Sequence, residues 1–484
     1  MSSRLKSKTL RALPWSFVES VVNGVVGIAQ TFVITWFLAP EQMGLAGIAL
    51  AVVGTIEIIS NLGMSEAVIA APSSHTRVSD TAFTGVMVAT IVGTLICLLL
   101  AGPVATLYGE PEVAGLLMLA ALTLPFNNFV VVPTALFTRK MRAAVVTLRI
   151  TMGRVMTLIA IGVLAAMGFG AWAVVGGTVI GSALTAVALL PAIQRLPRLR
   201  FNWAEFKSLL KFGSAMSVER LLWGAMPRLF WLIIGYLHGP AVLGFFQFAQ
   251  RLVDETANLI QTFSIRFGLS FFAALKRAGR DPVEAFLKAS RLIGLVAAPV
   301  FLGIAVVMPD AIGSLFDDRW APAAIVSQLT ALGWIFGFPR VLTGPLLRAE
   351  NRMGAILFYA FTASATTLIA GALTGGFGLA VIGLAWIVRH VVGVFWGLYV
   401  LKRYMGVGYL QQFAPYWRSL LSAGLMAAAV MGAAHQVPDW SHGQRFLLEV
   451  AVGGISYILL ILLIDRPSIR LVRDLARGAK AARG

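Results

Sequence analysis

The sequence predicts an all-α integral membrane protein, and three observations support this fold class. Of the 484 residues, 58% are apolar and only 12% are charged, whereas a soluble chain carries about 25% charged residues. Apolar runs of about 20 residues, the length that crosses a bilayer as a helix, recur along the whole chain. The Lys and Arg residues concentrate in every second connection between these runs. Together the observations exclude an ordinary soluble enzyme and a disordered or collagen-like chain.

Fourteen apolar runs are candidate membrane spans, taken here in chain order. A basic segment without a small-residue cleavage site precedes the first run, which we therefore interpret as a retained span. The first six runs cover residues 14–37, 43–70, 81–107, 113–137, 148–167 and 171–193. After a basic stretch, the next six cover residues 209–236, 241–272, 287–308, 322–347, 354–374 and 378–401. The last two cover residues 419–435 and 444–464.

The basic residues predict the orientation of these spans. With the N-terminus in the cytoplasm, thirty of the 39 Lys and Arg residues fall in cytoplasmic connections or tails. The external connections hold only Arg319 and Arg445. One missed span would mix the two sets, so we expect both termini to be cytoplasmic. The net charge of +18 then reflects topology and gives no reason to expect nucleic acid as a partner.

The chain contains an internal repeat. At an offset of 200 residues, Pro40 recurs as Pro240 and Gly44 as Gly244, and in the later spans Phe126 pairs with Phe338. Six spans per repeat predict two six-helix lobes related by a pseudo-twofold axis along the membrane normal, with the substrate site between them. We expect an N-terminal lobe at residues 1–200, a C-terminal lobe at 201–405, and two further helices with a basic tail at 406–484. A duplicated scaffold that does not transport is the alternative.

Seven arginines remain inside the spans. Each costs about 2.5–3.5 kcal/mol at the centre of a spanning helix, so we expect these side chains to face the bundle interior or a wet cavity. Arg266 lies close enough to an interface to reach it. A guanidinium binds two phosphoryl oxygens at once, which points to an anionic substrate. The predicted substrate-binding residues are Arg154, Arg220, Arg228, Arg251, Arg340 and Arg389.

The eighth span carries a polar stripe. Its polar residues recur every three or four positions and fall within an arc of about 80° on one helix face. This pattern is typical of the wall of a water-filled passage, and a polar clamp between helices is the alternative. The stripe consists of Gln247, Arg251, Asp254, Asn258 and Gln261. The first span has a similar face that includes Asn23 and Gln30.

Two interpretations of the acidic residues in the spans stay open. They could take up a proton or a cation as the cavity alternates, or they could only neutralise the arginines. The acids concerned are Glu19, Glu57, Asp254 and Glu255. The single cysteine, Cys97, makes neither an internal disulfide nor a zinc site, and no histidine or carboxylate cluster has catalytic spacing. We therefore expect no metal, no cofactor and no catalytic residue, and so no enzyme.

Several short motifs carry a resemblance to a known family. The segment Leu38-Ala-Pro-Glu-Gln-Met-Gly44 and the hairpin Gly168-Phe-Gly-Ala-Trp172 resemble the hairpins of bacterial polysaccharide exporters. Asp317-Asp-Arg-Trp-Ala-Pro322 resembles the external entry to their tenth span, and Leu347-Arg-Ala-Glu-Asn-Arg352 resembles its cytoplasmic exit. The chain is similar to the Wzx-type flippases of the multidrug/oligosaccharidyl-lipid/polysaccharide exporter superfamily.

The resemblance implies a flippase that moves a polyprenyl-pyrophosphate-linked oligosaccharide across the bacterial cytoplasmic (inner) membrane by alternating access. The product would serve exopolysaccharide, capsule or O-antigen assembly. The resemblance also implies a cationic central cavity and membrane lipids as surroundings. It further implies a coupling cation or proton, and polysaccharide assembly proteins as partners. The alternatives are a peptidoglycan-precursor flippase, a drug exporter of the same superfamily, and a membrane polysaccharide polymerase or glycosyltransferase.

The predicted topology can be tested by cysteine labelling. Single cysteines placed near Glu110 and Asp318 should react with an impermeant thiol reagent added outside intact cells. Cysteines near Lys140 and Arg277 should react only after the membrane is opened. Labelling of the second pair from outside would contradict the orientation derived from the basic residues.

Overall fold

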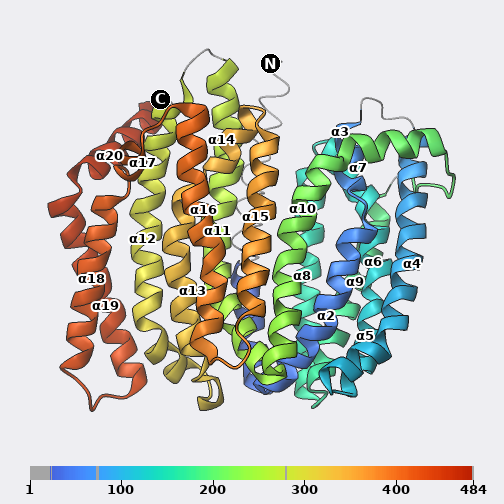
Figure 1. Ribbon diagram of the computed structural model, residues 1–484, viewed down its shortest axis with the longest axis horizontal. Helices are drawn as coiled ribbons and strands as arrows, with labels where there is room; N and C mark the ends of the chain where they lie inside the picture. Colours follow the sequence, from blue (N-terminus) through green and yellow to red (C-terminus); the bar gives the residue numbers. More distant parts are fainter. Residues whose placement is uncertain (1–21, 23, 72–75, 194, 278–280, 482–484) are drawn as a thin grey trace. The chain divides into compact units, whose positions relative to one another are not determined.

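The computed structural model describes residues 22, 24–71, 76–193, 195–277 and 281–481. These residues form helices joined by short connections, with no strand among them (Figure 1). Eleven helical segments are long and apolar enough to cross a membrane. Large apolar side chains on them are exposed, such as Leu99 at 77% and Leu463 at 68%, as expected where lipid replaces water. The all-α membrane fold predicted from the sequence is confirmed.

The helices follow the expected spans in order. In the first half they are α2 (Pro40–Ser60), α3 (Met64–Ala70), α4 (Thr76–Tyr108), α5 (Glu112–Ala121), α6 (Thr123–Phe129), α7 (Val131–Arg139), α8 (Ala143–Ala166), α9 (Ala171–Leu189), η1 (Leu190–Ala192) and α10 (Trp203–His238). In the second half they are α11 (Pro240–Arg277), α12 (Pro282–Leu315), η2 (Asp318–Trp320), α13 (Ala323–Gly337), η3 (Phe338–Arg340), α14 (Thr343–Ala349), α15 (Met353–Ala372), α16 (Leu379–Met405), α17 (Tyr409–Phe413), α18 (Trp417–His435), α19 (His442–Ile464) and α20 (Arg466–Ala481).

Three expected spans are not among the eleven segments, and each corresponds to a helix. The first expected span begins outside the described residues and continues as an apolar helix at Gly24–Phe37. The seventh and eighth expected spans are the long helices α10 and α11. The count of fourteen therefore stays a prediction.

Three spans are broken helices. The segment 40–70 consists of α2 and α3, the segment 112–139 of α5 to α7, and the segment 323–349 of α13, η3 and α14. Irregular backbone at membrane depth is tolerated where it is buried in protein or lines a cavity. The second and third of these segments are related by the repeat, since Phe126 in α6 corresponds to Phe338 in η3. Both halves of the chain thus interrupt the same span.

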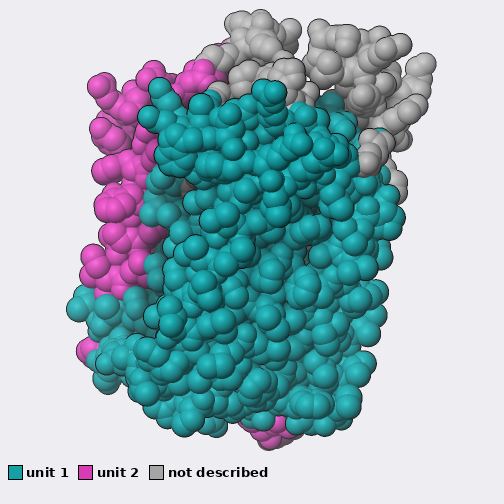
Figure 2. Space-filling model, turned by 90° about the vertical axis from the view of Figure 1, so that its right-hand side faces the viewer, with its two compact units in different colours: residues 1–251, 371–376 teal, residues 252–370, 377–484 magenta. Residues whose placement is uncertain are grey.

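The chain divides into two compact units (Figure 2). The first contains residues 1–251 and 371–376, and the second contains residues 252–370 and 377–484. Helix α10 belongs with the first unit because it packs against α2, α3 and α4. The lobe boundaries expected near residues 200 and 405 stay predictions.

A reciprocal contact joins the two copies of the repeated hairpin within the first unit. Helices α2 and α11 begin at the equivalent residues Pro40 and Pro240. A Cβ atom on Gly44 would lie 1.8 Å from the carbonyl oxygen of Pro240, and one on Gly244 would lie 1.9 Å from that of Pro40. Only glycine permits backbones to approach this closely. The repeat recognised in the sequence is therefore a symmetric packing contact in the structure.

The last two spanning helices of the second unit, α18 and α19, pack against each other and against α12. The Tyr457 hydroxyl on α19 donates to the carbonyl oxygen of Leu295 on α12 at 2.7 Å. Between α19 and α20, the buried Asp465 carboxylate accepts hydrogen bonds from the hydroxyls of Ser419, near the start of α18, and Ser468 in α20. Polar contacts thus fix both the packing on α12 and the start of α20.

The reciprocal glycine contact predicts a strong effect of a single methyl group. In Gly44→Ala or Gly244→Ala, the new Cβ must push the facing backbone away, which should lower stability by about 1–3 kcal/mol. Gly424→Ala in α18 is the matched control, because a Cβ there meets nothing within 4 Å and alanine favours a helix. Thermal unfolding of the purified variants in detergent measures the difference. Equal stability of all three variants would contradict the contact.

Candidate functional site

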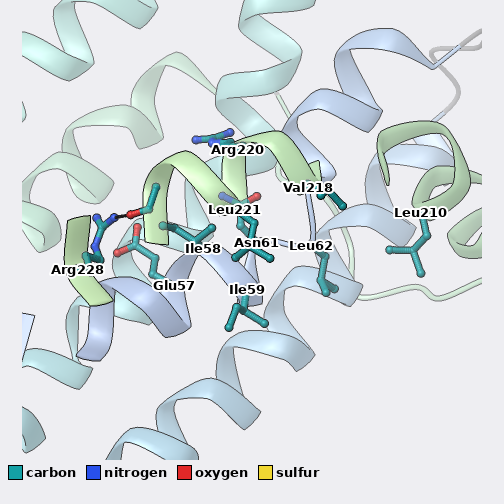
Figure 3. A pocket seen from close by; sticks show the side chains of 12 residues that line it. Glu57, Ile58, Ile59, Asn61, Leu62, Leu210, Val218, Arg220, Leu221 and Arg228 are labelled. Atoms are coloured by element: carbon teal, nitrogen blue, oxygen red, sulfur yellow. Dashed lines mark hydrogen bonds between the residues drawn. The ribbon is translucent and has the colours of Figure 1, made fainter. Parts of the chain in front are cut away.

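A cavity of about 580 Å³ lies in the first unit between the end of α2 and the middle of α10 (Figure 3). It is present because α2 stops at Ser60 and the chain turns through Leu62 and Gly63, with φ angles of 52° and 64°. Glycine adopts this left-handed conformation freely, whereas for leucine it is strained. The break opens the wall of the bundle within the candidate span 40–70. The lining residues are Glu57, Ile58, Ile59, Asn61, Leu62, Gly63, Leu210, Val218, Arg220, Leu221, Gly224 and Arg228.

The cavity brings one carboxylate into a group of arginines. Glu57 interacts electrostatically with Arg228, Arg220 and Arg149, and Figure 3 shows its carboxylate beside the Arg228 guanidinium. The Glu57 Oε2 atom accepts a hydrogen bond of 3.3 Å from the Asn127 Nδ2 atom. Three positive charges thus surround Glu57, and Arg220 also pairs with Glu66, so three guanidinium groups face two carboxylates and the group keeps an excess of positive charge.

Neighbouring residues fix the positions of these arginines. The Arg228 stem lies against Gly54 of α2, where a Cβ would come within 2.3 Å of the Arg228 Nε atom. Its Nη1 atom donates to the carbonyl oxygen of Gly224 at 2.6 Å. Arg220 forms an ion pair with Glu66 of α3, and its side chain is 56% exposed. Arg228 is therefore held against α2, while Arg220 lies at the open side of the cavity.

A second, polar cavity of about 260 Å³ lies in the same unit, on the other side of Asn127. Arg149 and Arg154 of α8 line it, and the buried Arg149 Nε atom has no hydrogen-bond partner among the described residues. Its other lining residues are Gln30, Asn127, Ile150, Gly153, Thr157, Gly181, Ser182 and Thr185. Because Asn127 bonds to Glu57 and lines this cavity, the Glu57–Asn127 pair connects the two cavities of the unit.

The second unit contains a separate pair of buried arginines. Arg389 stacks on the Trp386 ring at 3.8 Å, and its Nε atom donates to the His390 Nε2 atom at 3.2 Å. An Nη2 atom of Arg340 lies 3.3 Å from the other ring nitrogen of His390. A neutral imidazole has only one acceptor nitrogen, and guanidinium nitrogens only donate. One of the two contacts therefore sets donor against donor, so His390 cannot accept hydrogen bonds from both arginines.

A third cavity of about 440 Å³ adjoins this cluster. Its walls are mostly apolar, and its polar members include Arg340 and Thr343. The Arg340 Nε and Thr343 Oγ1 atoms are buried and have no hydrogen-bond partner among the described residues. Asp254 is the nearby negative charge of the cluster, since it interacts with Arg389 and accepts a hydrogen bond of 2.8 Å from the Trp334 Nε1 atom.

The polar stripe of α11 does not have one uniform environment. Gln247 is buried against α2, where a Cβ on Gly47 would meet its side-chain amide. Arg251, Glu255 and Gln261 are half-buried, and Asn258 is exposed. Gln247 therefore packs against α2 with its buried Nε2 atom lacking a hydrogen-bond partner among the described residues, and both interpretations of the stripe stay predictions.

Several of the predicted residues thus fall into three groups, and a few others lie outside the described residues. Arg220, Arg228 and Glu57 share the first cavity, Arg154 and Gln30 share the second, and Arg340, Arg389 and Asp254 lie in the second unit. Glu19, Asn23 and the side chain of Arg266 lie outside the described residues.

Arg149 was not among the predicted site residues, because it was one of the thirty basic residues assigned to cytoplasmic connections. Helix α8 begins at Ala143, so Arg149 is already two turns inside it. The available signal was the spacing of Arg149, Gly153 and Thr157, which places all three on one helix face. Asn127 was missed because its polar role depends on the break between α5 and α7.

Comparisons with known proteins agree with this architecture. The succinoglycan biosynthesis transport protein ExoT of Rhizobium meliloti (strain 1021) is 25% identical over 99% of this chain and 98% of its own length. The lipopolysaccharide biosynthesis protein WzxC of Escherichia coli (strain K12) is 20% identical over 85% of each chain.

Two solved structures share the fold. The lipid II flippase MurJ, in an inward closed conformation, has a TM-score of 0.76 and 13% identity over 93% of this chain and 99% of that chain. An inward-facing multidrug resistance transporter of the MATE family has a TM-score of 0.62 and 14% identity over 78% and 95%. The family described as polysaccharide biosynthesis protein matches residues 33–325. Since that match covers more than half of the sequence, the chain belongs to the polysaccharide biosynthesis protein family, which confirms the resemblance to Wzx-type flippases.

Proposed function

We propose that the protein is a flippase that moves a polyprenyl-pyrophosphate-linked oligosaccharide from the cytoplasmic to the outer leaflet by alternating access. The transported unit would serve the assembly of exopolysaccharide, capsule or O-antigen. The observation that carries the proposal is the excess of guanidinium groups around Glu57 in the cavities of the first unit. The relatives named for succinoglycan transport and lipopolysaccharide biosynthesis support the substrate class.

The charges of the site suit a diphosphate headgroup. A diphosphate offers several oxygens to the forked donors of Arg228, Arg220 and Arg149, and these bonds are strong in a partly dry cavity. The polar lining of the second cavity, with the amides of Gln30 and Asn127 and the hydroxyls of Thr157 and Ser182, suits sugar hydroxyl groups. Headgroup and first sugar would then occupy neighbouring cavities on the two sides of the Glu57–Asn127 pair.

Glu57 gives the proposed cycle a means of release. The Glu57 carboxylate and the diphosphate compete for the same guanidinium groups. Binding the diphosphate while Glu57 is ionised therefore costs free energy through repulsion between the negative charges. A proton or a cation on Glu57 favours loading, and its departure favours release of the lipid headgroup. This competition assigns Glu57 the coupling role, and Glu66 holds Arg220 when the cavity is empty.

Removing one guanidinium should impair transport without impairing assembly. Arg228→Ala and Arg149→Ala should lower the rate of export by about 10- to 100-fold, because a hydrogen bond to a charged group contributes about 1.5–3 kcal/mol. Lys207→Ala and Arg142→Ala are matched controls, since these exposed residues lie on α10 and directly before α8. The measurements are complementation of an export-deficient strain, membrane abundance, and the leaflet in which the lipid-linked intermediate accumulates. Full complementation by both cavity variants would contradict the proposal.

Glu57→Gln separates binding from turnover. Loss of the competing carboxylate should tighten binding of inorganic pyrophosphate or a short polyprenyl diphosphate to the purified protein by about tenfold. The same variant should export more slowly, because release is no longer driven. Calorimetric titration and the complementation assay provide the two readings. Weaker binding in Glu57→Gln than in the native protein would mean that Glu57 does not compete with the substrate.

A further inference from the structure

A second charged cluster lies between α12 and α19, apart from the arginine cavities. Asp310 comes from α12, and His442, Arg445 and Glu449 come from one face of α19 at spacings of three and four. The His442 Nδ1 atom lies 2.7 Å from Asp310 Oδ1, and an Nη2 atom of Arg445 lies 3.4 Å from Asp310 Oδ2. Asp310 and Glu449 are only 4% and 3% exposed. The cluster thus places two carboxyl groups in the interior of the helix packing.

The two carboxyl groups interact with each other and share one arginine. Glu449 lies one helical turn from Arg445, on the face of α19 that contacts Asp310, and the two acids interact electrostatically. The Glu449 Oε2 atom is buried without a hydrogen-bond partner among the described residues. Ionised carboxylates only accept hydrogen bonds, so a direct bond between the two groups requires a proton on one of them. Arg445 balances one negative charge, and a second negative charge beside the first would be costly at this depth.

We propose that Asp310 and Glu449 form a proton-binding site in which the two carboxyl groups share one proton. His442 connects this site to water, because its side chain is 58% exposed while its ring contacts Asp310. The site lies at the end of α12 and the beginning of α19, which the distribution of basic residues predicts to be the external side. The charged residues of the adjoining connections are exposed: Asp317, Asp318, Arg319, His435 and Asp439.

The position of the site suggests what the proton controls. Helix α19 packs on α12 through Asp310 at this end and through the Tyr457–Leu295 bond further along. Loss of the shared proton would leave two buried negative charges against Arg445 alone and would weaken the contact between α12 and α19 at this end. The packing of the α18–α19 pair therefore responds to the acidity of the solution that His442 contacts.

Infrared spectroscopy of the purified full-length protein tests the proposal. At neutral pH, the difference spectrum between the native protein and Glu449→Gln should contain the carbonyl band of a buried carboxylic acid. Glu112→Gln, at the exposed start of α5, is the matched control and should retain the band. Identical spectra of the native protein and Glu449→Gln would show that both acids are ionised and would overturn the proposal.

Comparing Glu449→Gln with Asp310→Asn distinguishes a proton shared by the two acids from a proton held by Glu449 alone. Glu449→Gln should keep a thermal transition close to that of the native protein, because the amide can donate to Asp310 as the acid does. Asp310→Asn should lose the carboxylic acid band, because Glu449 then pairs with Arg445 as a carboxylate. Persistence of the band in Asp310→Asn would place the proton on Glu449 alone and would overturn the shared site.

Discussion

The protein depends on keeping charged groups stable inside a membrane-spanning bundle. Each guanidinium at membrane depth carries a large desolvation cost, which is offset only by acceptors, by water or by a bound anion. In the first unit, Glu57, Glu66 and the two cavities offset that cost for Arg149, Arg220 and Arg228. Because Glu57 and Glu66 together serve three guanidinium groups, the balance is incomplete. An anionic ligand would complete it.

Interrupted helices supply the space and the polar groups for this arrangement. The break between α2 and α3 opens the first cavity, and the break around α6 brings Asn127 to Glu57. The repeat places η3 at the position that corresponds to α6, and there the second unit has Arg340. A continuous helix would turn these side chains to different faces and would close the cavities. Transport proteins accept such breaks where the irregular backbone lines a cavity.

The two repeats have diverged in their charges while keeping their packing. The reciprocal contacts of Gly44 with Pro240 and of Gly244 with Pro40 still obey the symmetry of the repeat. The arginines do not, because Arg389 and Arg340 flank His390 and contact Trp386 and Tyr359. Aromatic faces stabilise a guanidinium through cation–π contact in a dry environment. In the first unit, the second cavity is lined largely by polar side chains and the first combines apolar walls with Glu57, Arg220 and Arg228, whereas the third cavity is mostly apolar. One duplicated scaffold thus holds two kinds of cationic site.

The sequence by itself determined the membrane fold and the repeat, and it predicted the orientation and identified most of the buried arginines. It could do so because hydrocarbon requires long apolar helices and because charge at membrane depth is rare enough to be informative. Only the tertiary structure decided which arginines share a cavity. It placed Arg149 with Glu57, set Gln247 against α2, and brought Asp310 to Glu449 across 139 positions of the chain. These neighbours come from helices that are distant in sequence, and their contacts depend on where small residues let the helices approach and where each helix breaks. A linear pattern of residue types records neither.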